Sequence, residues 1–353
     1  MRKLRILVLA AILILTTAAC DNGANSGTGD SAAVDADGGT STDSDGSAAS
    51  PSSDVAPVTI RIGHNVASDL IKYYMKTNPE YADNLGVEYE LEWSEFSGVA
   101  PAVQALAAGT VDVATVSAIA AGNAIEQGAD LLITGQTITE MEGWASSQWL
   151  TLNDSGIDGP EDMRGRTWST TGIGNTGYFA FREWLRQNGV EEGEYDVIES
   201  PFPIQEEILR AGEGDIGEFV PPFTINAMES GDFKVIVSAV DIIGEWAGLL
   251  SAFRVEFAEE HPEAVEAFME DWQKVANFVR DPENKEAVLE STETVTGVPT
   301  ENLQYLLTNE DFFRPEDGRV DMERLQAVWD LFYDWGGLSE RLVAEEFVWS
   351  GWQ

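Results

Sequence analysis

The sequence contains few of the residues that metal sites and nucleophilic enzymes use. Its 353 residues include one cysteine, Cys20, and two histidines, His64 and His261. One cysteine excludes an intrachain disulfide and a thiolate zinc site, and two histidines exclude a three-histidine metal site. The G-x-S-x-G elbow of a serine hydrolase and the G-x-x-x-x-G-K-[ST] loop of an ATPase are also missing. The sequence therefore predicts no enzyme, metal or cofactor, although a carboxylate pair among 62 acidic residues stays open.

Basic residues are scarce as well. Only 20 lysines and arginines accompany the 62 acidic residues, which gives a formal net charge of −42. Because such a polyanion repels phosphate backbones, nucleic acid is excluded as a partner. Hydrophobic residues (43%) and aromatic residues (10%) suffice for a large core. At ~150 residues per domain, the length predicts two folded lobes.

The first twenty residues have the order of a lipoprotein signal peptide. Basic residues at positions 2, 3 and 5 precede an apolar run over residues 6–15, which is too short to span a bilayer. Thr17-Ala18-Ala19-Cys20 resembles the lipobox at which bacterial lipoproteins are cleaved and acylated. We expect lipidation at Cys20 and an extracytoplasmic protein held at the membrane by this anchor only. The alternative is an ordinary signal peptide in which Cys20 is incidental.

Residues 21–56 consist mainly of Asp, Gly, Ser, Ala and Thr, with no basic and no aromatic residue. Such a segment buries too little apolar surface to offset the entropy lost on ordering, so we expect a disordered acidic Gly/Ser tether.

From residue 58 onward, short apolar runs alternate with helical patterns. This order predicts an α/β fold with two lobes, each a mostly parallel sheet flanked by helices. We assign residues 57–150 and 252–353 to lobe I and residues 151–251 to lobe II. The main expected strands are 58–63, 87–93, 111–116, 131–134, 166–171, 197–199, 216–220 and 235–239, and the main expected helices are 68–77, 101–108, 118–127, 178–187, 205–211, a long one from Pro262, and 322–335.

One internal echo supports two lobes of a single plan. Residues 106–112 (LAAGTVD) and 209–215 (LRAGEGD) share a helix end, a glycine and an aspartate three residues later, and both precede a strand. Chance is the competing explanation, because short patterns often match by accident.

Residues 172–177 (GIGNTG) form a literal G-x-G-x-x-G between a strand and a helix, with Glu199 about twenty residues later. A dinucleotide site is disfavoured because an exported protein meets little of that cofactor. We favour a ligand cradle over a mere turn. A helix start attracts anionic groups, and Thr171, Asn175 and Thr176 add side-chain donors.

Open α/β sheets bind ligands beyond the carboxyl ends of their strands. This rule selects His64, Asn65, Ser97, Ser117, Thr171 and Glu218 as candidate ligand contacts. A structural role for His64 and a solvated role for Glu218 remain open. Trp144 and Trp246 lie beside glycines where the chain should cross between lobes, so they are candidate cleft walls, with core packing as the alternative.

Three segments resemble a known family. They are residues 98–114 (GVAPAVQALAAGTVDVA), 159–168 (GPEDMRGRTW) and 261–268 (HPEAVEAF). The chain resembles the substrate-binding lipoproteins of bacterial ABC importers, of the nitrate/taurine/alkanesulfonate type. The resemblance implies a type II periplasmic-binding fold whose lobes are joined by crossing strands. It also implies a permease partner with a separate cytoplasmic ATPase. The sequence departs from an anion binder in that no basic residue is placed to neutralise an anion.

We therefore expect a monomeric solute-binding protein that captures a small organic anion or zwitterion, such as taurine, an alkanesulfonate or an aromatic carboxylate. The alternatives are a binder of a neutral pyrimidine or vitamin precursor, and a secreted enzyme, either a hydrolase or a dehydrogenase.

Overall fold

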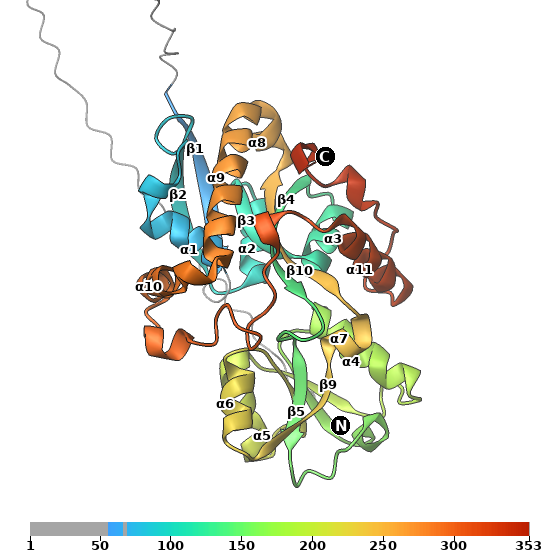
Figure 1. Cartoon of the computed structure of the whole chain (residues 1–353). Coiled ribbons are helices and arrows are strands. Elements are labelled where there is room, and N and C mark those ends of the chain that lie inside the picture. Colours follow the sequence, from blue (N-terminus) through green and yellow to red (C-terminus); the bar gives the residue numbers. More distant parts are fainter. Residues whose placement is uncertain (1–55, 66–68, 353) are drawn as a thin grey trace, which may run out of the picture. The chain divides into compact units, whose positions relative to one another are not determined.

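The computed structural model describes residues 56–65 and 69–352, which lie in one compact unit (Figure 1). The expected signal peptide, Cys20 and nearly all of the expected tether lie outside these residues. Within the described ranges, no helix is both long and apolar enough to cross a membrane.

The first of two five-stranded sheets in the described residues has the strand order β2-β1-β3-β10-β4. β2 and β3 run parallel to β1, whereas β10 runs antiparallel to both β3 and β4. Four strands thus share one direction and only β10 opposes them. The strands are β1 (Val58–Asn65), β2 (Tyr89–Phe96), β3 (Val113–Ser117), β4 (Leu131–Glu140) and β10 (Trp246–Arg254).

The second sheet repeats this arrangement in the order β7-β6-β8-β5-β9. β7 and β8 run parallel to β6, and β5 runs antiparallel to β8 and β9. The expectation of two mostly parallel sheets is confirmed. The strands are β5 (Gln148–Leu152), β6 (Thr167–Thr170), β7 (Asp196–Glu199), β8 (Ile216–Phe219) and β9 (Phe233–Ser238).

The chain passes between the sheets twice, from β4 to β5 and from β9 to β10. The strand that follows each passage is the one that opposes its sheet. Our lobe boundaries at residues 150 and 251 fall inside β5 and β10, so the change of sheet occurs a few residues earlier than expected. Both strands are largely buried at those positions.

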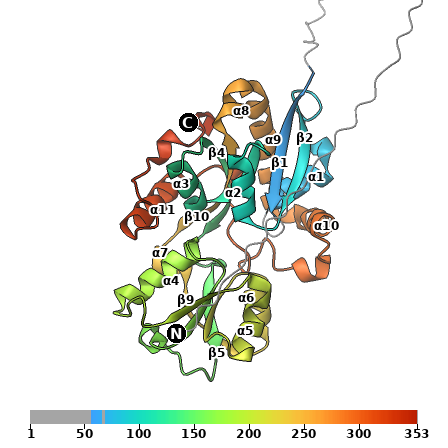
Figure 2. The same ribbon diagram turned by 180° about the vertical axis from the view of Figure 1, so that it is seen from behind.

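The helices cover both faces of each sheet. Figure 1 shows α9 on one face of the first sheet, and Figure 2 shows α2 on the opposite face. In the second sheet, α5 and α6 pack against Phe219 and Leu150, while Phe181 of α4 stacks on Trp149 of the other face. The α-helices are α1 (Leu70–Thr77), α2 (Val99–Ala107), α3 (Ala118–Glu126), α4 (Thr176–Gln187), α5 (Gln205–Ala211), α6 (Phe223–Glu229), α7 (Ala239–Ile243), α8 (Val255–Glu260), α9 (Pro262–Arg280), α10 (Lys285–Thr296) and α11 (Met322–Asp334).

Local sequence explains where several helices begin. Asn175, Ser117 and Asp321 each accept a hydrogen bond from the first turn of α4, α3 and α11. Pro262 opens α9, where its missing N–H costs nothing. The apolar stripe of α9 is fully internal, which confirms that it is core. Its buried members are Val265, Phe268, Met269, Trp272, Val275 and Val279.

The internal echo has a structural basis. Asp112, just before β3, donates its backbone N–H to Arg61 O (2.7 Å) and accepts the Arg61 backbone N–H on its carboxylate (2.9 Å). Asp215, just before β8, makes the same two bonds with Thr167, both at 2.7 Å. In each half, one aspartate therefore ties a strand to its parallel neighbour.

Candidate ligand cleft

The carboxyl ends of the parallel strands in the two sheets face each other. β4 ends at Glu140 and β5 begins at Gln148, so a short segment joins the two edges. The second passage is equally short, because β9 ends at Ser238 and β10 begins at Trp246. These two connections hold the ligand-binding edge of one sheet opposite that of the other.

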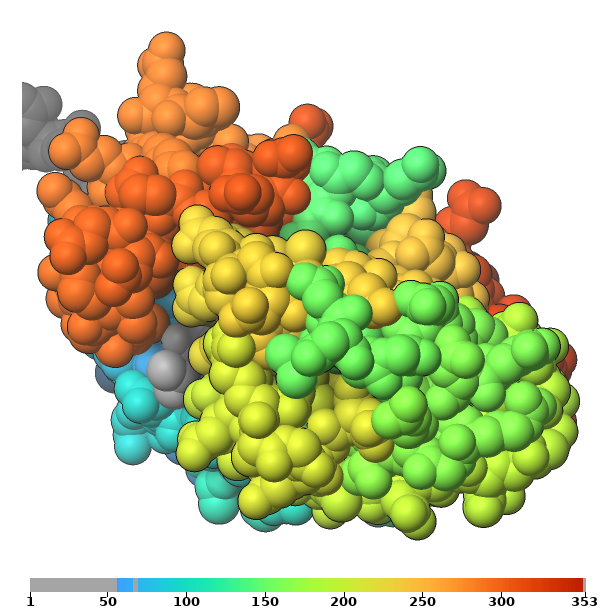
Figure 3. All heavy atoms as spheres, turned by 90° about the horizontal axis from the view of Figure 1, so that it is seen from below, coloured from blue at the N-terminus to red at the C-terminus, as the bar shows by residue number. Residues whose placement is uncertain are grey.

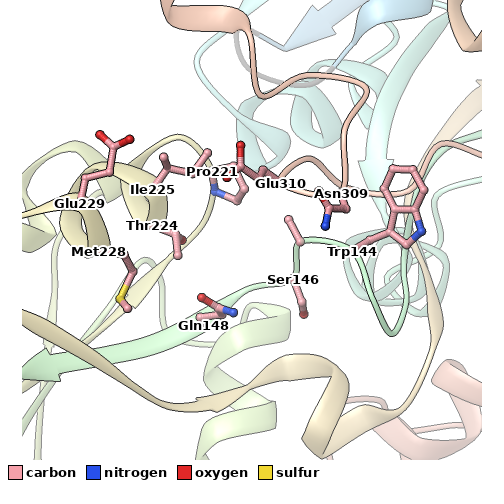
Figure 4. Close-up of a pocket in the computed structure, with 11 residues that line it drawn as sticks. Trp144, Ser146, Gln148, Pro221, Thr224, Ile225, Met228, Glu229, Asn309 and Glu310 are labelled. Atoms are coloured by element: carbon pink, nitrogen blue, oxygen red, sulfur yellow. The ribbon is translucent and has the colours of Figure 1, made fainter. Parts of the chain in front are cut away.

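A cavity of about 440 Å³ lies beside the β4–β5 passage (Figure 4). In Figure 4, the α6 side chains line one side, Trp144 and Asn309 line the other, and Ser146 and Gln148 lie between them. Figure 3 shows the yellow atoms of the α6 region beside the orange to red atoms of the later segment. The lining residues are Trp144, Ala145, Ser146, Gln148, Pro221, Thr224, Ile225, Met228, Glu229, Asn309 and Glu310.

The Asn309–Glu310 wall is anchored to the first passage. Ala145 N donates to Asp311 O (3.1 Å), and Thr139 N donates to Phe313 O (2.8 Å). Trp144 packs edge-on against Phe313 at a centroid distance of 5.3 Å. Asp311 and Arg314 form a buried ion pair within this segment. The wall thus belongs to the first-sheet half, whereas α6 belongs to the second, and the cavity lies between them.

Glu218 of β8 is a buried carboxylate at the start of α4, with a relative exposure of 3%. Its Oε2 accepts the Thr171 hydroxyl at 3.0 Å. A Cβ at Gly177 would lie within 2.5 Å of the Glu218 Cδ, so only glycine allows this approach. Burial raises the pKa of Glu218 to about 7, although hydrogen bonds from Thr171 oppose the shift.

Glu140, at the end of β4, is the second buried carboxylate of this region. It accepts hydrogen bonds from the Ser146 hydroxyl and from Ser147 N (3.1 Å). Burial, and to a lesser degree the negative charge of Glu218, raises the pKa of Glu140 to about 7. Because Ser146 lines the cavity, Glu140 lies one hydrogen bond behind the cavity wall.

Comparison with known proteins places the chain in a family. Residues 71–285 match the family model described as "NMT1/THI5 like". The chain belongs to this family. It is 26% identical over 245 residues to the taurine-binding periplasmic protein of Escherichia coli K12, a match that covers 66% of this chain and 72% of the relative.

Solved structures show the same fold as this NMT1/THI5-like chain. The alkanesulfonate-binding protein SsuA of Xanthomonas axonopodis pv. citri, bound to MOPS, gives a TM-score of 0.66 at 17% identity, covering 84% of this chain and 99% of SsuA. The periplasmic nitrate-binding protein NrtA of Synechocystis PCC 6803 gives 0.63 at 13% identity, covering 83% and 86%. The desulfurization enzyme DSZB also matches, with a TM-score of 0.61 at 12% identity, covering 82% and 96%. The two-lobed periplasmic-binding fold expected from the sequence is therefore confirmed.

In this NMT1/THI5-like chain, the glycine loop is hydrogen-bonded internally. Asn175 caps α4 through Oδ1, and its Nδ2 donates to the Thr171 hydroxyl (2.8 Å). The Glu199 carboxylate accepts the backbone N–H of Ile173 (2.7 Å). Thr176 is half-buried in the first turn of α4. The helix start expected to cradle an anion thus has the chain's own Glu218 carboxylate against it, and a ligand role for these residues stays a prediction.

The first-sheet candidates take different positions. His64 is fully buried, its Nε2 lies 2.9 Å from Lys76 Nζ, and its ring packs edge-on against Trp93. Burial, reinforced by the charge of Lys76, lowers the pKa of His64. These contacts match the structural alternative for His64. Asn65 is buried, Ser97 is exposed, and Ser117 accepts a bond from Ala120 N at the start of α3.

The two tryptophans differ. Trp144 lines the cavity, whereas Trp246 is 3% exposed within the core, opposite Glu140 in the β4–β10 pairing. Sequence reasoning did not single out Glu140, Gln148, Thr224, Met228 or Asn309. Glu140 and Gln148 flank the passage from β4 to β5. Because the sequence predicted that this strand ends at Thr134, neither residue was recognised as lying at a strand end.

The arginines of the described chain and Lys72 have protein partners outside the lining of the cavity. Each arginine in residues 56–65 and 69–352 lies within ion-pair distance of a carboxylate. Lys72 is buried, with Nζ donating to Gly63 O (2.8 Å) and Thr115 Oγ1 (2.7 Å). The residues that line the cavity include no lysine or arginine. An acid group of a ligand would therefore find neutral donors there rather than a cation.

Proposed function

We propose that this protein is the extracytoplasmic solute-binding component of an ABC importer. The single observation that carries the proposal is a cavity lined from both halves of a two-lobed fold, beside the passage that joins them. The taurine-binding relative and membership of the family support it. The partners would be a permease and its separate cytoplasmic ATPase, and the protein would act as a monomer.

The cavity suggests how binding would be coupled to closure. α6 moves with the second half and the Asn309–Glu310 segment with the first, so a solute that touches both stabilises the closed arrangement. Micromolar affinity needs only about 8 kcal/mol, which a few buried hydrogen bonds and apolar contacts supply. The permease would recognise the closed form of the protein, and the solute would be released to it chemically unchanged.

The solute class follows the relatives. A small organic anion or zwitterion, of the taurine, alkanesulfonate or aromatic carboxylate kind, is the first candidate. A neutral pyrimidine or vitamin precursor is the second, because Trp144 offers a ring face in the cavity. The proposed contacts are Trp144 at the cavity, and His64, Asn65, Ser97, Ser117, Thr171, Asn175, Thr176, Glu218 and Trp246 along the two edges.

A thermal-shift screen with a parallel product assay tests the proposal. Saturable stabilisation of the protein by one solute class, with the solute recovered unchanged, is the expected result. Trp144→Ala should weaken that solute by about tenfold, since a buried aromatic contact contributes about 1.4 kcal/mol. Trp349→Ala is the matched control and should leave the affinity unchanged, because Trp349 lies beside Ile133, near the end of β4 opposite to Glu140. Conversion of the solute to product would overturn the carrier function.

We propose further that Cys20 carries the lipid anchor. Cys20→Ala should move the protein from the membrane fraction to the soluble fraction, because the expected tether has no other apolar attachment. A variant that remains in the membrane fraction would contradict the anchor without touching the solute-binding function.

A further inference from the structure

We infer that the cleft takes an organic cation: a solute with a protonated nitrogen on an apolar or aromatic body and no compensating acid group. This inference deepens the proposed function and rests on it. It departs from the anion or zwitterion class suggested by the relatives, and it is carried by the charges around the cavity.

Two carboxylates line the cavity, and its lining residues include no lysine or arginine. Glu229 and Glu310 contribute to its lining, and Glu140 lies behind Ser146. The nearest arginine along the chain on the Asn309 side, Arg314, already pairs with buried Asp311. A sulfonate or carboxylate would enter this field at a cost, whereas an ammonium group would gain from it.

The N-terminus of α4, which could have attracted an anionic ligand, already has a carboxylate of the protein against it. Glu218 lies against Gly177 in the first turn of α4, and Thr171 donates to its carboxylate. A carboxylate at this position uses the positive end of the helix dipole for itself. The second half therefore has a carboxyl group rather than a basic group at the start of α4.

Two other buried carboxylates of the described chain are balanced by cations. Asp112 pairs with two arginines, and Glu183 pairs with Arg186. Glu140 and Glu218 instead accept hydrogen bonds from serine and threonine donors and have no basic partner at ion-pair distance in the described chain. A cation between the two halves would offset the cost of ionising them.

The rest of the lining suits an apolar or aromatic body. Trp144, Ile225 and Met228 supply apolar surface, and the face of Trp144 can attract a cation. Gln148 and Asn309 offer neutral hydrogen-bonding groups. The Thr224 hydroxyl has a buried oxygen with no hydrogen-bond partner among the described residues, so a polar atom of a solute could satisfy it.

A matched series of probes tests the inference by calorimetry with purified protein. 2-Phenylethylamine, phenylalanine, 3-phenylpropionate and 2-phenylethanol share one ring and differ in charge, and taurine and ethanesulfonate represent the relatives' class. The amine should bind at least tenfold more tightly than each of the other probes. Glu140→Gln and Glu218→Gln should each weaken the amine several-fold and leave 2-phenylethanol unchanged. Glu183→Gln, a buried carboxylate away from the cavity, is the control and should leave both affinities unchanged.

The outcomes separate the inference from the proposed function. Equal or tighter saturable binding of taurine, ethanesulfonate, phenylalanine or 3-phenylpropionate would overturn the cationic class and leave the solute-binding function standing. Failure of the amine to bind at millimolar concentration would overturn the cationic class too. Conversion of any probe to product would overturn the proposed function itself.

Discussion

Each half of the molecule has an aspartate that binds the neighbouring parallel strand in the same way, but the two aspartates differ in their exposure to solvent. Asp112 and Asp215 each hold a backbone N–H of the neighbouring parallel strand. The Asp112 side chain is 2% exposed and paired with Arg61 and Arg254, whereas the Asp215 side chain is 31% exposed and paired with Arg166 alone. The hydrogen-bonding scheme is therefore repeated, but the ion pairs that accompany it are more buried in the first half.

The ligand-facing edges differ more than the scaffold does. In the first half, buried Asp69 accepts the Thr115 hydroxyl (2.8 Å), and Lys72 donates to that same hydroxyl oxygen (2.7 Å). In the second half, buried Glu218 has the Thr171 hydroxyl and no basic neighbour at ion-pair distance in the described chain. The two halves thus share a plan but differ in whether a basic residue lies beside the buried acid at this edge.

The largest predicted effect contrasts the two aspartates. Asp112→Ala should lower the free energy of unfolding by about 3 kcal/mol, because it breaks a buried ion pair and frees two arginines. Asp215→Ala should lower it by about 1 kcal/mol, because its pair is half-exposed and screened by solvent. Urea unfolding followed by circular dichroism measures both. Equal losses of unfolding free energy in the two variants would show that the greater burial of Asp112 does not make its ion pairs more stabilising.

A second prediction concerns the contact of Gly177 with Glu218. Gly177→Ala should destabilise the fold by about 2 kcal/mol, because its Cβ would overlap the Glu218 carboxylate. Gly172→Ala, five residues earlier in the same loop, is the matched control, since its Cβ would meet Asn175 Nδ2 at an ordinary 3.5 Å. Adding Glu218→Ala to Gly177→Ala should recover much of the loss in a double-mutant cycle. Strict additivity would mean that the two residues do not compete for the same space.

The sequence predicted the parts of this fold that depend on local pattern. The alternation of strands and helices, the apolar stripe of α9 and the repeated aspartate all follow from spacing within one segment. β5 and β10 were not predicted as strands, because their buried residues show neither a two-residue alternation nor a turn signal. Their positions became visible only through pairing with strands far along the chain.

The cleft was predictable only in outline. The rule that ligands bind at strand ends selected Glu218 and His64 as candidates, and the glycines near the expected crossing selected Trp144, which lines the cavity. The rule could not say which way a side chain points, and His64 lies in the core between Tyr73 and Trp93. It also could not bring Asn309 to Gln148, because that proximity depends on the backbone bonds of Ala145 and Thr139 to residues beyond 310.

The smallest predicted effect is a pH dependence that has opposite signs at two buried acids. The pKa of Glu218 is raised to about 7, so the folded state binds a proton more tightly than the unfolded chain between roughly pH 4.5 and 7. Stability from this group is therefore greatest at low pH and falls as the pH rises through that window.

At Asp112, burial alone would raise the pKa, but hydrogen bonds from Arg61 and Arg254 lower it. The stability that Asp112 contributes is therefore present above about pH 4 and is lost as the pH falls below that value. Glu218→Gln should accordingly be more stable relative to the parent at pH 8 than at pH 5, whereas Asp112→Asn should lose stability at both pH values, as measured by urea unfolding. A Glu218→Gln difference that is constant with pH would mean that the pKa of Glu218 is not raised in the folded protein.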